Sequence, residues 1–202
     1  MLRDEQDMSW QRPLRRPFCK GCYGFSLMEL LSVLVLAALL LSQAVPAFSE
    51  FMARNRLAAA TNDVRGCLSF ARQSAITQAR PVAVCPGDSS TGCSTDWSMG
   101  SWLVFADSDH DGRLGGGENL LREGRVPGMA EGVSVSGNGP FRQAVVFVPQ
   151  GHAERVSGAF ASGRLRVCVQ GGGGSSAREL ILSASGRVRL RSVDFDGACP
   201  PL

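Results

Sequence analysis

Apolar residues fill the segment from Phe25 to Val45 almost without interruption. Between Leu30 and Val45 the only polar members are Ser32, Ser42 and Gln43. A helix needs about 20 apolar residues to cross the hydrocarbon core of a bilayer. The h-region of a signal peptide is shorter and is followed by a small-residue cleavage site. The pattern therefore predicts a membrane-spanning helix.

Beyond Pro46 the spacing of apolar residues becomes that of an amphipathic helix. Apolar side chains recur three or four positions apart, at Leu57, Ala60, Val64, Leu68, Ala71 and Ala75. The pattern predicts a helix that continues to about Ala79 and stops at Pro81, since proline cannot continue a helix. Its one apolar face must pack on a folded domain.

From Val82 onward short apolar runs are separated by Gly, Pro, Asp and Ser, which is typical of strands and turns. The predicted strands are 82–85, 101–106, 119–125, 132–136, 144–148, 165–170, 179–183 and 187–192. No helix-length crossover separates them, so we expect antiparallel pairing. The predicted fold class is α+β, with the amphipathic half of a long N-terminal helix packed on a C-terminal antiparallel β domain.

Charge fixes the expected orientation of the span. The basic residues of segment 1–24 precede it, which predicts a cytoplasmic N-terminus and a globular domain outside the inner membrane. The net charge of +3 is too small to predict a polyanion partner from bulk charge. We expect four parts: 1–24, a leader that is removed; 25–46, the span; 47–80, the amphipathic helix; and 81–202, the β domain.

Glu29 is the one ionisable residue within the predicted span. A charge inside a membrane is costly and usually marks function, so Glu29 needs a cationic partner. Cleavage after Gly24 would free the α-amino group of Phe25. That amine, on a neighbouring copy, could neutralise Glu29 and so couple processing to assembly.

The segment Gly24-Phe25-Ser26-Leu27-Met28-Glu29 resembles the N-terminus of type IV pilins and type II secretion pseudopilins. The resemblance implies that prepilin peptidase cuts after Gly24 and methylates Phe25, and that Glu29 supports filament assembly. Pro46 matches the proline at which pilin helices bend. The alternative interpretation is an ordinary signal anchor that contains a chance glutamate.

A second resemblance covers most of the remaining chain. A long helix is followed by a short loop between cysteines, a Trp102-x-x-Phe105-x-Asp107 strand and a C-terminal cysteine. This order resembles the GspH/FimT branch, which includes FimT/FimU-like minor pilins and the minor pseudopilin of type II secretion.

Of the seven cysteines, the five that lie beyond the expected leader favour an oxidising location outside the cytoplasm. Cys19 and Cys22 form a C-x-x-C in the expected leader, and without a second pair they are weak evidence for zinc. We expect Cys85 to pair with Cys93, closing a short loop, and Cys168 to pair with Cys199, holding the chain end. Cys67 is then a buried free thiol.

An acidic segment fits the D-x-[DN]-x-[DN]-G-x5-E template of calcium loops. Its candidate ligands are Asp107, Asp109, Asp111 and Glu118. The flanks are strand-like rather than helical, unlike those of an EF-hand. The alternative is a solvated hairpin turn, in which Asp and Gly are favoured in any case. Ca²⁺ is the only cofactor that the sequence suggests.

Arginine alternates with apolar residues near the C-terminus, at Arg187, Arg189 and Arg191. On a strand these side chains would share one face, which Arg164, Arg166 and Arg178 could extend. The segment from Gly186 to Arg189 is similar to the G-R-x-R motif of FimT-type minor pilins, which implies non-specific DNA binding during natural transformation. The alternative is a charged strand edge that resists aggregation.

The leading interpretation is a FimT/FimU-like minor pilin that is processed, helps pilus assembly near the tip and contacts double-stranded DNA through Gly186 and the arginines. We expect it in the inner membrane and then in a filament with other pilins. The alternative is a structural GspH-type pseudopilin without DNA binding. A membrane-anchored enzyme is disfavoured, because neither His110 nor His152 accompanies a nucleophile motif.

Overall fold

The computed structural model describes residues 24–170, 175–195, 198–200 and 202. Most of the expected leader, with Cys19 and Cys22, lies outside these residues. The chain forms two compact units, which meet between Leu41 and Ser42. Helix α1 (Leu27–Gln78) begins in the first unit and ends in the second.

The start of α1 is capped by Ser26. Its hydroxyl oxygen accepts a hydrogen bond from the Met28 amide at 3.3 Å, and its carbonyl accepts from the Leu30 amide at 3.1 Å. Serine at this position satisfies amides that have no partner within the helix. Among the described residues, α1 is the one helix long and apolar enough to cross a membrane, and its most apolar window is unburied. The helix continues through Pro46.

The second half of α1 buries the predicted apolar face. Leu57, Ala60, Val64, Leu68, Ala71 and Ala75 are all at most 5% exposed. Their spacing places them on one side of the helix, and the small alanines allow close approach to the sheets. After Gln78 the chain leaves the helix at Ala79, whose φ of 51° is left-handed, as is common just after a helix end.

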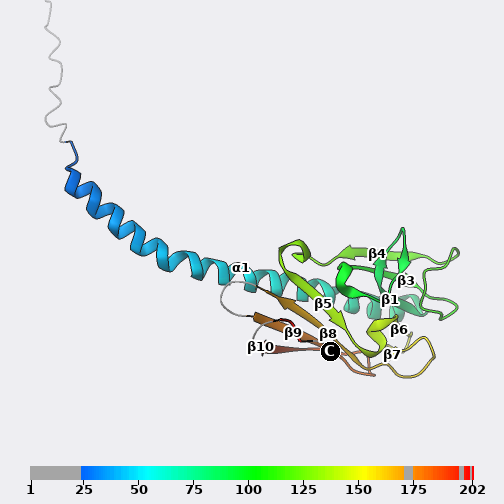
Figure 1. Ribbon diagram of the computed structural model, residues 1–202. Coiled ribbons are helices and arrows are strands. Elements are labelled where there is room, and N and C mark those ends of the chain that lie inside the picture. The colour runs from blue at the N-terminus through cyan, green and yellow to red at the C-terminus, as the bar shows by residue number, and fades with distance from the viewer. Residues whose placement is uncertain (1–23, 171–174, 196–197, 201) are drawn as a thin grey trace, which may run out of the picture. The chain divides into compact units, whose positions relative to one another are not determined.

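In the part of the chain that the structure describes, ten strands form two antiparallel sheets (Figure 1). The six-stranded sheet has the order β4-β3-β1-β6-β7, with β2 paired to β1, and the four-stranded sheet has the order β10-β9-β8-β5. The strands are β1 (Val82–Asp88), β2 (Gly92–Cys93), β3 (Ser101–Ala106), β4 (Leu120–Arg125), β5 (Val133–Gly137), β6 (Val145–Phe147), β7 (Ala153–Glu154), β8 (Gly163–Val169), β9 (Ser175–Leu182) and β10 (Val188–Phe195).

Each of the eight predicted strands overlaps an observed strand, and the antiparallel prediction is confirmed. The two-residue strands β2 and β7 were not predicted, because they are too short to show alternation. Three 3₁₀ turns were not predicted either: η1 (Trp97–Met99), η2 (Met129–Glu131) and η3 (Gly139–Arg142).

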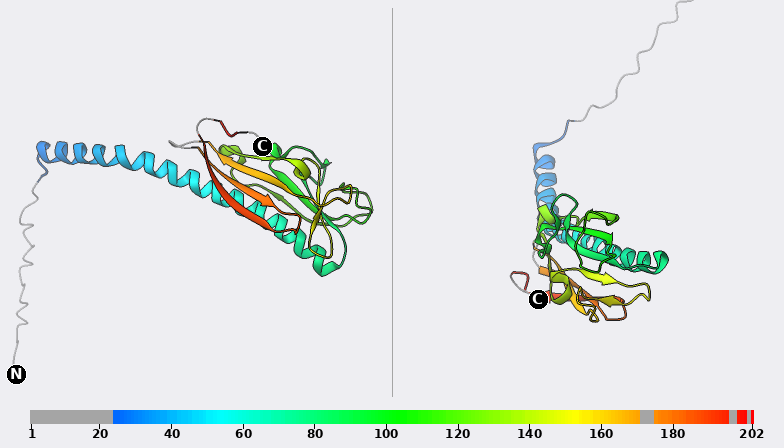
Figure 2. Two further views of the ribbon diagram at one scale, coloured as in Figure 1. Left: turned by 90° about the horizontal axis from the view of Figure 1, so that it is seen from below. Right: turned by 90° about the vertical axis from the view of Figure 1, so that its right-hand side faces the viewer.

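One core joins the second half of α1 to both sheets (Figure 2). Its members include Trp102 and Phe147 of the six-stranded sheet, Leu165 and Leu180 of the four-stranded sheet, and Leu68 of the helix. A second, smaller cluster covers the other face of the six-stranded sheet and includes Phe105. The β domain is therefore built on the helix, and the expected α+β fold is confirmed.

Candidate functional site

The residues expected to act in processing and assembly lie at the start of α1. Phe25 is 86% exposed, and Glu29 is exposed in the first turn of the helix. Ser26 and Glu29 have the S-x-x-E spacing of a capping box. No basic group among the described residues forms an ion pair with Glu29. The Glu29 carboxylate is therefore exposed and without an ion pair in the part of the chain that the structure describes.

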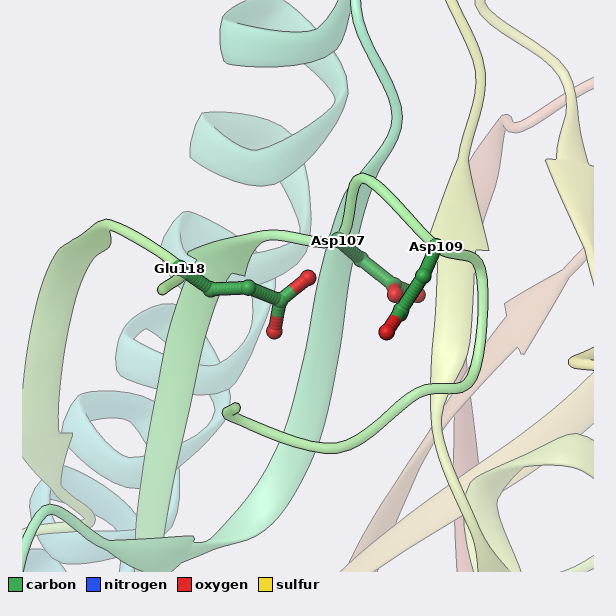
Figure 3. Close-up of side chains that lie close together, drawn as sticks. All are labelled: Asp107, Asp109 and Glu118. Carbon is green, nitrogen blue, oxygen red and sulfur yellow. The ribbon is translucent and has the colours of Figure 1, made fainter. Parts of the chain in front are cut away.

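The acidic turn connects β3 to β4, and three of its four predicted ligands lie together. Carboxylate oxygens of Asp107, Asp109 and Glu118 lie within 4.8 Å of one another, and Figure 3 shows the three side chains converging. Asp111 is outside this group, and its carboxylate accepts a hydrogen bond from the Arg113 amide at 2.7 Å. The structure thus brings together three carboxylates rather than four.

Backbone amides already donate hydrogen bonds to the carboxylates of this cluster. The fully buried Asp107 carboxylate accepts from the amides of Asp111 at 3.0 Å and Gly112 at 3.2 Å. Glu118 accepts from the amides of Ser108 at 2.9 Å and Gly115 at 3.0 Å. These bonds are those expected of an Asp-rich turn. The same carboxylates are close enough together to share one hard cation such as Ca²⁺.

Asp107 has a strongly shifted pKa. Burial of its carboxyl group, and next the nearby charge of Glu118, raise this pKa from 3.8 to about 6. Hydrogen bonds from the Gly112 and Asp111 amides oppose the shift without cancelling it. The charged form of Asp107 is therefore destabilised in the folded protein unless a cation compensates it.

The arginine-rich segment forms the edge strand of the four-stranded sheet. Arg187 lies in the turn before β10, while Arg189 and Arg191 are in the strand, and all three are exposed. Register pairs Arg189 with Ile181 and Arg191 with Glu179. Because side chains alternate along a strand, Arg189 and Arg191 share one face.

Only part of the predicted extension of this face exists. Arg164 is paired with Ile181 and Arg166 with Glu179, so both belong to the same face. Arg178 is paired with Ser192, one position out of phase, so the expectation that it extends the stripe is wrong.

Arg166 is also unavailable to a ligand. It is 8% exposed, and its Nε donates to the Glu179 carboxylate at 3.1 Å within a buried ion pair. Another nitrogen of its guanidinium group donates to the Pro200 carbonyl. Arg166 therefore stabilises the C-terminal end of the chain instead of contributing free charge.

A groove of about 400 Å³ lies between α1 and the segment that begins β10. One wall comes from the helix, and the other is Gly186, Arg187, Val188 and Arg189. The helix residues are Arg65, Leu68, Ser69, Arg72 and Gln73. Four arginines and no acidic residue line the groove, so it is suited to an anion.

Sequence reasoning missed Arg65 and Arg72 as members of this site. They are seven positions apart and therefore lie on one side of the helix, next to the apolar face. Helical periodicity could have grouped these two arginines. It could not have shown that they lie beside a turn more than a hundred residues further along the chain.

The turn between β9 and β10 is held in place by Arg72. Its Nε donates to the Gly151 carbonyl at 2.8 Å, and its Nη2 donates to the Ser185 carbonyl at 3.4 Å. Gly186 has a φ of 74°, and a Cβ added there would lie 2.2 Å from the Gly151 carbonyl oxygen. The glycine of the Gly186-Arg187-Val188-Arg189 segment therefore allows close backbone packing, which positions the arginines that follow.

The disulfides have the expected pairing. Cys85 is bonded to Cys93, with Cα atoms 5.6 Å apart, and Cys168 to Cys199, with Cα atoms 6.0 Å apart. Cys67 is a free, buried cysteine. Burial raises the pKa of its thiol well above the usual value, and the charge of Asp63 acts in the same direction. Cys67 is consequently an unreactive part of the core.

A long N-terminal apolar helix whose second half packs on antiparallel sheets defines the pilin-like α+β class, to which minor pilins and pseudopilins belong. The family model described as "Type II transport protein GspH" matches residues 60–186. The chain belongs to the GspH family. The match extends from the second half of α1 to Gly186, and β10 lies beyond it.

One solved structure supports this fold, and two others are similar at lower TM-scores. The type IV minor pilin FimU of Pseudomonas aeruginosa matches with 20% identity and a TM-score of 0.50, covering 70% of this chain and 92% of that chain. A second crystal form of FimU has 18% identity, a TM-score of 0.47 and coverages of 67% and 92%. The minor pseudopilin EpsH from the type 2 secretion system of Vibrio cholerae has 13% identity and a TM-score of 0.43, and the match covers 66% of this chain and 93% of that chain. No curated protein sequence gives a significant match.

Proposed function

We propose that this protein is a FimT/FimU-like minor type IV pilin that binds DNA without sequence preference. The observation that carries the proposal is the exposed arginine segment at Arg187, Arg189 and Arg191. None of the three forms an ion pair with any residue that the structure describes. Unpaired guanidinium groups bind phosphates well, because their planar N–H donors match the phosphate oxygens.

Contacts of this kind bind the DNA backbone and do not read bases. The affinity should therefore be similar for unrelated sequences and should fall steeply with salt, as counterions are released from the DNA. Gly186 contributes by allowing the turn to pack closely, rather than by touching the ligand.

Processing and assembly form the second part of the proposal. Prepilin peptidase cuts after Gly24, and the new α-amino group of Phe25 pairs with Glu29 of a neighbouring subunit. The capped start of α1 and the exposed Glu29 support this step. The protein would lie in the inner membrane with its β domain in the periplasm, and then join other pilins at or near the pilus tip.

A GspH-type pseudopilin is the second candidate, favoured by the description of the matching family model. Such a protein would share the N-terminal processing and the fold, and it would have a structural role in a secretion filament. DNA binding separates the two candidates, since the pseudopilin has no need of it.

The test is DNA binding by the full chain in neutral detergent. Fluorescence anisotropy would measure the affinity for a 30-base-pair duplex between about 50 and 200 mM salt, the range over which phosphate contacts weaken strongly. Arg187→Ala/Arg189→Ala should weaken binding about tenfold or more and reduce the salt slope by about 2. The matched control is Arg125→Ala/Arg142→Ala, which removes two exposed arginines elsewhere. A folded parent that does not bind DNA would support the pseudopilin alternative.

A further inference from the structure

We propose that the groove between α1 and the start of β10 holds the DNA backbone, and that Arg65 on the helix is one of its phosphate contacts. This inference rests on the proposed DNA-binding function and deepens it. The binding site then consists of two walls, the arginine segment and the helix, rather than a single strand.

The charges around the groove are all of one sign. Arg65, Arg187 and Arg189 line it and form no ion pair among the described residues. Arg72 also lines it, with its Nε and Nη2 engaged by backbone carbonyls. Arg72 is therefore a positioning residue for the turn, whereas the exposed Arg65 is free to contact a ligand.

The spacing of the arginines favours a polymer over a single phosphate. Arg65 and Arg72 are separated by about 10.5 Å along the helix at 1.5 Å per residue. Arg187, in the turn, and Arg189, in β10, are two residues apart, which corresponds to at most about 7 Å of chain. Duplex DNA carries one negative charge per about 1.7 Å of its axis, so several phosphates would face these arginines together.

The remaining lining identifies the part of DNA that is bound. The groove has a volume of about 400 Å³. Its other lining residues are Leu68, Ser69, Gln73, Gly186 and Val188, with no aromatic ring among them. Proteins that bind bases without sequence preference stack them on aromatic rings. The groove therefore takes the sugar–phosphate backbone and ignores the bases.

Arg65→Ala tests this inference in the full chain in neutral detergent. It should weaken binding of the 30-base-pair duplex about three- to tenfold and lower the salt slope by about 1. The matched control Arg125→Ala removes one exposed arginine at the end of β4, outside the groove, and should bind like the parent. Thermal melting should be unchanged in both variants, because neither side chain makes a hydrogen bond or ion pair in the described structure.

The outcomes separate the inference from the function on which it rests. If Arg65→Ala binds like the parent while Arg187→Ala/Arg189→Ala binds weakly, the helix wall is excluded and the DNA-binding function stands. If the folded parent does not bind DNA, both are overturned. If both variants bind DNA weakly and the control variant binds it like the parent, the two-walled site is supported.

Inorganic phosphate distinguishes a polymer site from a simple anion site. Added phosphate should displace the duplex only as strongly as chloride of equal ionic strength, because one phosphate cannot span the arginines. Stronger displacement by phosphate would show that the groove binds the free anion, and it would overturn the assignment to the DNA backbone.

Discussion

At the scale of single residues, the turn before β10 depends on one glycine and one arginine. Gly186 comes so close to the Gly151 carbonyl that no other residue fits, and Arg72 connects both loops to the helix. The arginines that we propose bind phosphate follow this turn directly. Their placement is therefore controlled by residues that need not touch DNA.

Gly186→Ala should destabilise the folded protein. Alanine at a left-handed φ costs roughly 1–2 kcal/mol, and the clash with Gly151 adds to this. The matched control is Gly158→Ala, since Gly158 has a φ of 77° and nothing within 4 Å of an added Cβ. Chemical denaturation should show a clearly larger loss of unfolding free energy for Gly186→Ala than for Gly158→Ala. Equal losses would mean that the turn adapts and that close packing is unimportant.

Asp107 should make stability depend on pH in an unusual direction. Its pKa is about 6 in the folded protein, against 3.8 for the ordinary side chain. The folded state thus binds the proton more tightly, so this contribution is present below pH 4 and is lost as the pH rises to about 6. The loss is at most about 3 kcal/mol. Asp107→Asn should remove most of this dependence, as measured by thermal melts in chelator between pH 4 and 7, and an unchanged profile would contradict the assignment.

Calcium provides a further test of the same carboxylates. If the acidic turn binds Ca²⁺, adding the ion at neutral pH raises the melting temperature and a chelator lowers it. Asp109→Asn would then abolish the response, while Asp111→Asn, outside the cluster, would leave it largely intact. If neither calcium nor chelator changes the melting temperature, the calcium site is excluded and the acidic segment is a solvated hairpin turn.

At the scale of elements, the C-terminal end of the chain is anchored to the four-stranded sheet. The Cys168–Cys199 disulfide joins it to β8, and Arg166 of the same strand binds the Pro200 carbonyl. β10 is the edge of this sheet, and its exposed arginines also discourage edge-to-edge aggregation. The exposed arginines are therefore compatible with both interpretations of the strand, DNA binding and protection against aggregation. Only binding experiments distinguish the two.

Cys199→Ser should lower stability more than Cys93→Ser. The bond from Cys168 to Cys199 closes a separation of 31 residues, and that from Cys85 to Cys93 closes one of 8. In the chain-entropy model the first is worth about 3.5 kcal/mol and the second about 2.5 kcal/mol. Urea denaturation of the two variants checks this order. The reverse order would show that local packing outweighs loop length.

At the scale of the whole molecule, one chain combines an apolar helical segment with a β domain whose core includes the second half of the same helix. We propose that the apolar helical segment serves membrane insertion and filament assembly, and the β domain carries the proposed ligand site. The connection is covalent, because α1 runs through both units. The buried core lies within the second unit, so a change at Glu29 should affect assembly without disturbing the β domain.

Glu29→Gln should spare cleavage after Gly24 and reduce incorporation into filaments. The reason is the loss of the charge that pairs with the Phe25 amine of a neighbouring subunit. Immunoblots of cells would report the shortened chain, and sheared filaments would report its incorporation. Normal abundance of Glu29→Gln in sheared filaments would contradict this role, and Gly24→Ala, which should remain uncut, serves as the processing control.

The sequence by itself determined the local elements of this protein. An uninterrupted apolar run specifies a helix of membrane length, and the spacing from Leu57 to Ala75 specifies a single buried face, because helix geometry is local. Strand positions followed from alternation and turn residues for the same reason. The strands β2 and β7 could not be predicted in this way, because two residues are too few to show a periodic pattern.

Only the tertiary structure decided how distant segments meet. Strand register placed Arg178 on the face opposite Arg189, and the path of the β3–β4 loop left Asp111 outside the carboxylate cluster. Helix packing brought Arg65 and Arg72 beside the turn at Gly186. Periodicity reports which side of an element a residue occupies, but not which other element that side faces. The second wall of the proposed DNA site is a property of packing, and packing depends on the whole core.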